Sequence, residues 1–152
     1  MNMTLEVVPV PVSDTDRAIE FYKKLGFIVD MDQRISDDVR FVQLTPPGSH
    51  CSIHIGEGTS TMAPGSVKGL ILMVDTAEAA KAELEKRGVK TSDIDELPWG
   101  KHVYFSDPDG NSWTLQESYA RKTPKKEVTG ARNRPKKEVT GARNRPKKEV
   151  TG

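Results

Sequence analysis

Two histidines, His54 and His102, are the side chains of this sequence best suited to acid–base chemistry. An imidazole has an ordinary pKa near 6.5, so it can accept a proton at neutral pH and act as a general base. Both lie in strand-like runs, and Glu117 in a third run completes the imidazole and carboxylate groups that could hold a relocated divalent metal. Glu117 is out of phase with Gln116, however, which puts it on the opposite face of its strand. The spacing contains no Ser–His–Asp constellation.

The cysteine and the two tryptophans point to less chemistry. Cys51 has the strand phase opposite to His54 and no base near it, so we interpret it as a packed thiol and not as a nucleophile. Trp113 shares the phase of Leu115 and is expected in the core. Trp99 lies in a loop, where it could stack on a planar or cationic ligand or serve only as a loop anchor.

The elements that must position these groups are written twice. Six identities recur sixty-two positions apart, where Val12, Ala18, Lys24, Gly26, Pro46 and Gly48 return as Val74, Ala80, Lys86, Gly88, Pro108 and Gly110. A strand end, a helix face, a helix stop and a Pro-x-Gly turn therefore stay in register. This pattern indicates two copies of one supersecondary unit, with a ligand expected at the seam between them.

Each copy predicts a strand, a helix and three further strands, the order βαβββ. In the first copy, Ser13 or Asp14 should cap a helix that Gly26 ends. In the second, Asp75 and Glu78 form a capping box. The predicted strands cover residues 5–12, 27–35, 38–45 and 50–56 in the first copy, and residues 70–74, 89–96, 101–106 and 112–118 in the second.

Two segments carry a resemblance to a known family, namely VPVSDTDRAIEFYKKLGF over 10–27 and FSDPDGNSWTLQE over 105–117. With the doubled βαβββ order, they make the sequence similar to the vicinal-oxygen-chelate superfamily of glyoxalase I, extradiol dioxygenases, and fosfomycin- and bleomycin-resistance proteins. The resemblance implies an α+β fold in which two βαβββ modules form a curled mixed sheet around a cleft, and it implies a homodimer. We interpret the DPDGN turn itself as structural, because its proline and glycine favour a turn.

The resemblance also implies where a metal would bind. Metal-dependent members of the family place ligands on the first and last strands of each module, and these positions correspond here to Val7, Ser52, Gly69 and Thr114. Divalent metals prefer imidazole or carboxylate donors at about 2.0–2.2 Å, which none of the four supplies. We therefore predict no metal site and no cofactor.

The leading hypothesis is a glyoxalase- or bleomycin-resistance-like protein that binds a small organic ligand, partly aromatic or cationic, without the metal of the family. The expected ligand-binding residues face the cleft and are Val7, Pro9, Ser52, His54, Gly69, Ile71, Met73, Trp99, His102, Tyr104, Thr114 and Gln116. The alternative is a glyoxalase-like lyase or isomerase that uses His54 or His102 as its catalytic residue, with or without a relocated metal.

Composition divides the chain into two parts. Residues 1–120 hold 11 Lys and Arg against 19 Asp and Glu, and we assign them to one glyoxalase-like domain with modules at about 4–56 and 69–120 and a linker at 57–68. An acidic surface favours solubility or attracts a cationic ligand. Residues 121–152 hold 12 Lys and Arg against 3 Asp and Glu in eleven-residue repeats, which predicts a basic, disordered tail.

A third reading makes this tail the working part, through contact with nucleic acid or anionic lipid. The tail has no aromatic residue for base stacking, so we do not expect nucleic acid as the partner. A single cysteine and the lack of a signal peptide or a run of about 20 apolar residues predict a cytoplasmic protein that does not enter a membrane.

Overall fold

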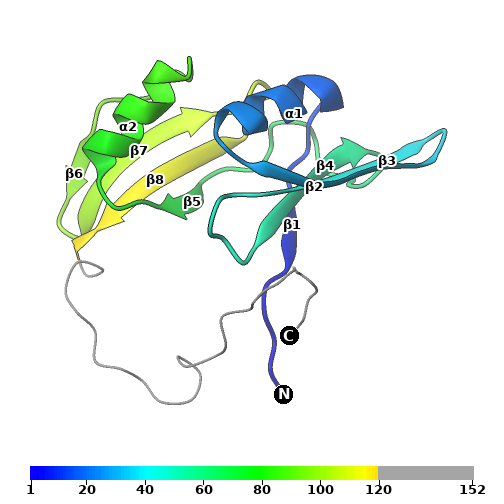
Figure 1. Cartoon of the computed structure of the whole chain (residues 1–152), viewed down its shortest axis with the longest axis horizontal. Helices are drawn as coiled ribbons and strands as arrows, with labels where there is room; N and C mark the ends of the chain where they lie inside the picture. The colour runs from blue at the N-terminus through cyan, green and yellow to red at the C-terminus, as the bar shows by residue number, and fades with distance from the viewer. Residues whose placement is uncertain (120–152) are drawn as a thin grey trace. The chain divides into compact units, whose positions relative to one another are not determined.

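Two βαβββ modules follow one another along the chain, as the sequence predicts (Figure 1). The computed structural model describes residues 1–119, so the predictions for the basic tail lie outside the described residues. The first module consists of β1 (Val7–Pro9), α1 (Thr15–Lys24), β2 (Ile28–Ser36), β3 (Val39–Thr45) and β4 (Ser52–Glu57). The second consists of β5 (Leu70–Met73), α2 (Ala77–Lys86), β6 (Asp95–Leu97), β7 (Gly100–Ser106) and β8 (Ser112–Ser118).

Each module forms its own four-stranded mixed sheet, and the sheets do not close into a barrel. The strand orders are β1-β4-β3-β2 and β5-β8-β7-β6. In each sheet the first strand pairs in parallel with the last, and the other pairs are antiparallel. β1 is thus an edge strand, which suits its proline because proline has no N–H to donate to a neighbour.

The sixth strand is much shorter than predicted. The sequence predicts a strand over 89–96, whereas β6 spans only Asp95–Leu97. Ser92 explains the difference, because its backbone N donates to Tyr104 O at 2.9 Å while its hydroxyl, not its carbonyl, accepts from Tyr104 N at 2.9 Å. The Ser92 carbonyl instead accepts from Lys81 Nζ at 2.8 Å. Side chains therefore take the places of the backbone partners that a strand would need.

The helix ends follow the sequence signals with one correction. Asp14 caps α1, since its carboxylate accepts from Arg17 N at 3.1 Å. At α2 the predicted capping box of Asp75 and Glu78 does not form. Thr76 is the cap, and its hydroxyl accepts from the backbone N–H of the third residue after it at 3.2 Å. The Glu78 carboxylate instead accepts from Lys101 Nζ at 2.8 Å.

The core lies between the helices and the sheets, where α1 and α2 cover one face of the strands (Figure 1). Alternate residues of the central strands point into it, as period-two patterning requires. Its buried apolar residues are Val10, Ala18, Tyr22, Phe27, Val42, Leu44, Ile53, Ile55, Ala77, Leu84, Val89, Val103, Phe105, Trp113 and Leu115. The prediction that Trp113 is a core residue is confirmed.

A buried hydrogen-bond network joins the two modules. The Asp107 carboxylate, in the DPDGN turn, accepts from Tyr22 Oη and from Asn111 Nδ2, each at 2.8 Å. Trp113 Nε1 donates to the Tyr22 hydroxyl at 2.9 Å. Burial raises the pKa of Tyr22 far above its usual range, and the neighbouring Asp107 charge raises it further. We call these four residues the Asp107 network. The turn therefore holds the second module against α1 of the first.

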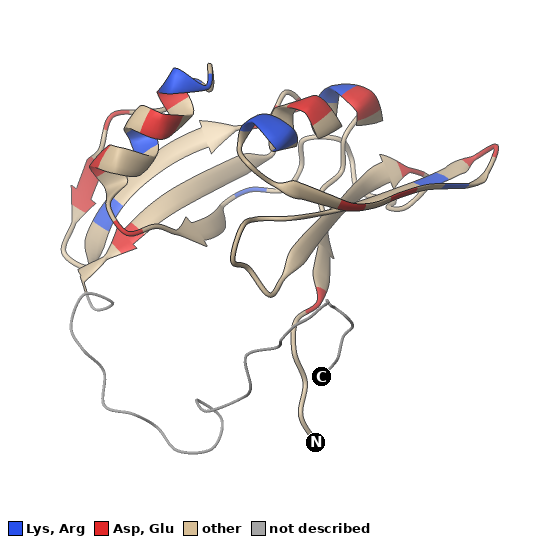
Figure 2. Cartoon of the chain, in the orientation of Figure 1, with Lys and Arg blue, Asp and Glu red and all other residues tan. Residues whose placement is uncertain are grey.

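Charged residues gather on both helices and on the hairpin of β2 and β3 (Figure 2). Arg40 pairs with Asp16 of α1 at 3.0 Å and with Asp32 of β2 at 2.9 Å. Hydrogen bonds from Arg40 hold the pKa of Asp32 below its ordinary value. Among residues 1–119, no helix has the length and apolar character needed to cross a membrane.

Candidate functional site

The sheet surfaces that turn away from the helices carry the residues predicted to bind a ligand. We call them the open faces, and they consist of the residues that alternate with the core positions of each strand. In the second sheet, for example, Val103 and Phe105 are buried under α2, whereas Tyr104 between them is 39% exposed. Strand alternation therefore puts His102 and Tyr104 on the open face, where His102 itself is only 5% exposed.

The open face of the first sheet joins residues from three strands. Val7 pairs with Ser52, and Pro9 pairs with His54 across the contact between β1 and β4. His54 also pairs with Gln43 of β3, in a row that crosses the sheet. The Ser52 hydroxyl lies 2.6 Å from that of Thr45. Four predicted residues thus lie side by side on this face, together with two β3 residues that the prediction missed.

The open face of the second sheet is richer in apolar and aromatic groups. Ile71 pairs with Thr114 and Met73 with Gln116, and β7 adds His102 opposite Gln116 and Tyr104 opposite Thr114. The exposed fractions are 57% for Ile71, 42% for Met73 and 59% for the nearby loop residue Trp99. Isolated exposed apolar residues are ordinary, but a cluster on one sheet face is typical of a binding surface.

An aromatic ring lies beside each histidine of the open faces. Phe41 stacks on His54 with ring centroids 5.1 Å apart and planes at 27°. Trp99 meets His102 edge to face at 6.3 Å and 77°. Burial lowers the pKa of His54. Phe41 was missed by the sequence reasoning, although its phase opposite Val42 would have placed it on this face.

Tyr104 and Asp95 form the polar pair of the second open face. The Tyr104 hydroxyl donates to Asp95 Oδ2 at 2.7 Å, and this bond raises the pKa of the tyrosine. Asp95 pairs with His102 in the strand register, so this carboxylate lies at the end of the histidine row. It was not predicted as a site residue, because the sequence gives no sign that β6 begins there.

The first strands of the two modules are offset by two residues from the sixty-two-residue repeat in the sequence. Val7 pairs with Ser52, but the residue that pairs with Thr114 is Ile71 and not Gly69. Gly69 lies just before β5 with φ near 80°, and its N–H donates to Ser112 O at 3.0 Å. Strand pairing therefore places Ile71, and not Gly69, beside Thr114, and the side chain of isoleucine likewise offers no atom that could bind a metal.

Glu117 points away from the open faces. Its side chain is buried, and Oε1 accepts from Ala77 N at 2.7 Å, at the start of α2. A carboxylate is favourable there because the helix N-terminus carries partial positive charge. Within residues 1–119, no three His, Cys, Asp or Glu side chains group closely enough to hold a metal ion. The positions that the resemblance implies for a metal are Val7, Ser52, Gly69 and Thr114. Their donor chemistry, and that of Ile71 beside Thr114, does not fit a divalent cation.

Cys51 precedes β4 and is half-buried. Burial raises the pKa of its thiol, and the charge of Glu6 raises it further. Both effects keep the sulfur protonated at neutral pH. Its chemistry therefore agrees with a packed thiol and not with a reactive thiolate.

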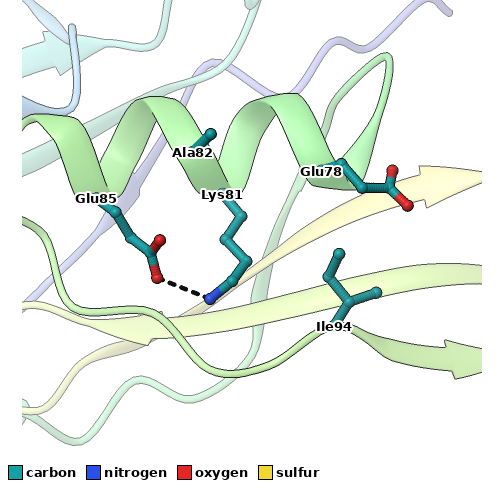
Figure 3. Close-up of a pocket in the computed structure, with 5 residues that line it drawn as sticks. All are labelled: Glu78, Lys81, Ala82, Glu85 and Ile94. Atoms are coloured by element: carbon teal, nitrogen blue, oxygen red, sulfur yellow. Dashed lines mark hydrogen bonds and ion pairs between the residues drawn. The ribbon is translucent and has the colours of Figure 1, made fainter.

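Two hollows lie away from the open faces. One of about 250 Å³ lies beside α2 and is lined by Glu78, Lys81, Ala82, Glu85 and Ile94 (Figure 3). Lys81 Nζ donates to Glu85 at 2.7 Å, to Thr91 at 2.9 Å and to Ser92 O at 2.8 Å, so its three N–H groups are all engaged. The other, of about 320 Å³, lies between the linker and the ends of β1 and β4, and its one titratable side chain, Glu57, is paired with Arg34 at 3.0 Å.

Known proteins share this arrangement of modules. The family described as "Glyoxalase/Bleomycin resistance protein/Dioxygenase superfamily" matches residues 4–115. The chain belongs to this superfamily. The family membership and the α+β fold predicted from the sequence are therefore confirmed.

Several solved structures of the superfamily resemble this chain. TnmS3, an antibiotic binding protein from Streptomyces sp. CB03234, is 36% identical, and the match covers 77% of this chain and 97% of that chain with a TM-score of 0.70. A glyoxalase/bleomycin resistance protein from the same organism is 37% identical, with 75% and 100% coverage and a TM-score of 0.66. A superfamily member from Sphaerobacter thermophilus is 30% identical, with 77% and 98% coverage and a TM-score of 0.68.

Proposed function

We propose that this chain binds a small, partly aromatic organic molecule on the open faces of its sheets and holds it without a metal ion. The observation that carries the proposal is the cluster of exposed apolar and aromatic side chains on the second open face, formed by Ile71, Met73, Trp99 and Tyr104. These side chains offer apolar area and ring faces to a ligand. The 36% identity to a protein described as antibiotic binding supports the same function.

The metal-free part of the proposal rests on donor chemistry. Valine and isoleucine offer no donor atom at Val7 and Ile71, and neutral hydroxyls at Ser52 and Thr114 are poor ligands. The two open-face histidines lie on separate sheets, and the carboxylate of Glu117 binds the start of α2 instead. Binding by shape, apolar area and a few polar groups needs none of these donors.

The expected affinity is modest. If a ligand covers about 300 Å² of apolar surface, burial contributes about 7 kcal/mol at about 25 cal/mol per Å². Part of this free energy is lost to the cost of association, so dissociation constants between about 10 μM and the millimolar range are expected. Such values are within reach of calorimetry and fluorescence titration.

Trp99 offers a direct test of ligand binding. A panel of aromatic antibiotics is titrated into the full chain, and binders should quench the emission of this exposed tryptophan while leaving that of buried Trp113. Trp99→Ala should weaken the binders by about tenfold, whereas Glu20→Ala, on the exposed surface of α1, should leave them unchanged. A panel that yields no binder by calorimetry refutes the proposal.

The same titration, repeated after dialysis against a chelator, tests the metal-free part. Affinity should not change. If affinity is lost after dialysis and added Zn²⁺, Ni²⁺, Fe²⁺ or Mn²⁺ restores it, this part is overturned. If the protein turns over a glyoxalase substrate, and His54→Ala or His102→Ala abolishes this turnover, the lyase or isomerase alternative is established instead.

We further propose that the protein acts as a cytoplasmic homodimer. The dimer is supported by β2, an edge strand that exposes Ile28 and Ile35 at 58% and 66%. The cytoplasmic location is supported by the free thiol of Cys51, which suits a reducing compartment. Exposed apolar edge strands favour pairing with another chain. Sedimentation equilibrium should give twice the mass of the chain, and Ile35→Glu should shift the equilibrium toward the monomer. A monomer at all accessible concentrations refutes this proposal.

A further inference from the structure

Each open face contains one imidazole in the same kind of setting. His54 lies in the middle of a row of paired residues between Pro9 and Gln43, and Phe41 stacks on its ring. His102 lies in a row between Gln116 and Asp95, and Trp99 meets its ring edge to face. The repeat in the sequence does not relate the two histidines, because they come from the fourth and the seventh strand. Each sheet therefore places a histidine next to an aromatic ring, although the two pairs come from strands that do not correspond in the repeat.

One nitrogen of each imidazole is buried without a partner. Among the described residues, His54 Nδ1 and His102 Nδ1 are the buried side-chain nitrogen or oxygen atoms that make no hydrogen bond. A charged imidazolium carries a proton on both nitrogens, so it would place an N–H at Nδ1 with no acceptor. Leaving a buried donor unpaired is costly, and leaving a buried charge unpaired costs more. An unprotonated Nδ1 avoids this unpaired donor, so the geometry favours the tautomer with the proton on Nε2 in each ring.

A neutral imidazole with its proton on Nε2 presents a hydrogen-bond donor without a positive charge. The adjacent ring presents an aromatic face, against which a flat ligand can stack. The partner that satisfies both groups is a planar ring system with an uncharged acceptor oxygen at its edge, such as a ketone or a lactone carbonyl. A cationic ligand is disfavoured here, because the N–H group turns its positive end toward the ligand and needs an acceptor.

We propose that His54 and His102 are the polar anchors of the open faces, where each donates Nε2–H to a carbonyl oxygen of a planar aromatic ligand that stacks on the neighbouring ring. This inference rests on the proposed function and narrows its ligand from partly aromatic molecules to neutral aromatic carbonyl compounds. The residues differ in role: the histidine favours ligands with an acceptor oxygen, and the aromatic ring favours planar ligands.

The tautomer can be tested without any ligand. In the full chain labelled with ¹⁵N, two-bond proton–nitrogen correlation spectra at pH 7.5 distinguish a protonated Nε2 from a protonated Nδ1. His54 and His102 should both show the neutral Nε2–H form. A protonated Nδ1, or a charged ring, at either position overturns the inference.

Ligand selection is tested with three flat tricyclic probes. 9-Fluorenone has a carbonyl oxygen, fluorene is the same skeleton without it, and proflavine is a planar cation. Fluorenone should bind about three- to tenfold more tightly than fluorene, which is the ratio expected for one net neutral hydrogen bond. Equal binding of fluorene and fluorenone, or tighter binding of proflavine, overturns the inference while leaving the proposed function intact.

Variants assign the preference to the histidines. His54→Phe and His102→Phe keep a ring but remove the donor, so each should reduce the ratio of fluorenone to fluorene affinity, and the double variant should bring it to one. His50→Phe is the matched control and should leave the ratio unchanged. If the ratio survives in the double variant, the inference fails. If none of the three probes binds the wild-type chain but aromatic antibiotics do, the inference also fails and the proposed function stands.

Discussion

Removing the Tyr22 hydroxyl should strongly destabilise the fold, because this one oxygen bonds both modules. It donates to the buried Asp107 carboxylate at 2.8 Å and accepts from Trp113 Nε1 at 2.9 Å. In Tyr22→Phe, Asp107 keeps Asn111 Nδ2 and two backbone donors at 2.9 Å, so the carboxylate remains partly satisfied. The indole N–H, in contrast, loses its acceptor in the core.

The magnitude follows from these two changes. A hydrogen bond to a charged group contributes about 1.5–3 kcal/mol, and a buried donor left unpaired costs about 1–3 kcal/mol. The two overlap in part, so Tyr22→Phe should reduce the free energy of unfolding by about 2–4 kcal/mol. For a domain of about 120 residues, this corresponds to a decrease in Tm of about 8–16 °C.

Urea titration followed by circular dichroism, at one protein concentration, measures the effect. Tyr119→Phe is the matched control, since it removes an exposed hydroxyl that donates to Glu96 at 2.6 Å, and it should leave the midpoint unchanged. In a double-mutant cycle, Trp113→Phe should cost less in the Tyr22→Phe background than alone. A loss below about 1 kcal/mol for Tyr22→Phe refutes the reasoning, because the network would then contribute no more than a surface contact.

Three further outcomes are expected in the same titrations. Glu117→Ala should cost about 2–3 kcal/mol, since α2 loses the carboxylate that bonds its first N–H, and Glu117→Gln should cost about half as much. Gly56→Ala should reduce the free energy of unfolding by more than about 2 kcal/mol, because the added Cβ would lie 1.9 Å from Arg40 O. Gly48→Ala is the control: φ is near 78° but the space is open, so the loss should be about 1 kcal/mol. Burial lowers the pKa of His54, so the unfolded chain binds more protons than the folded chain below pH 6.5. Stability should therefore fall between pH 6.5 and 5, and fall less in His54→Phe; an equal fall in both proteins would contradict this assignment.

The helices and their ends could be predicted because their signals are local. Gly26 and Gly88 both adopt positive φ, near 99° and 85°, immediately after the C-cap residues of α1 and α2, where a residue with a Cβ is strained. The cap of α2 was missed by one residue for a reason that is not local. The Glu78 carboxylate is attracted to Lys101, twenty-three positions away on β7, and so does not complete a capping box with Asp75.

The open faces could be predicted strand by strand, but their neighbours could not. Phase alone placed His54 and Tyr104 correctly on their faces. Asp95 reaches the row of His102 through strand pairing, and Phe41 stacks on His54 from the neighbouring strand; the sequence of one strand contains neither contact. The Asp107 network was missed for the same reason, since Tyr22 and Asp107 lie eighty-five positions apart and their contact depends on the packing of one module on the other.

The two modules match by helix register but not by the register of their first strands, and this difference has a structural cause. Five residues separate β1 from α1, whereas three separate β5 from α2. Pro11 lies in the longer connection, and its carbonyl accepts from Asn111 Nδ2 at 2.8 Å and from Gly65 N at 3.1 Å. The longer connection thus supplies the acceptor on which the turn of the second module docks. A uniform spacing of sixty-two therefore places Gly69 at the first-strand position of the second module, whereas the strand pairing places Ile71 there, opposite Thr114.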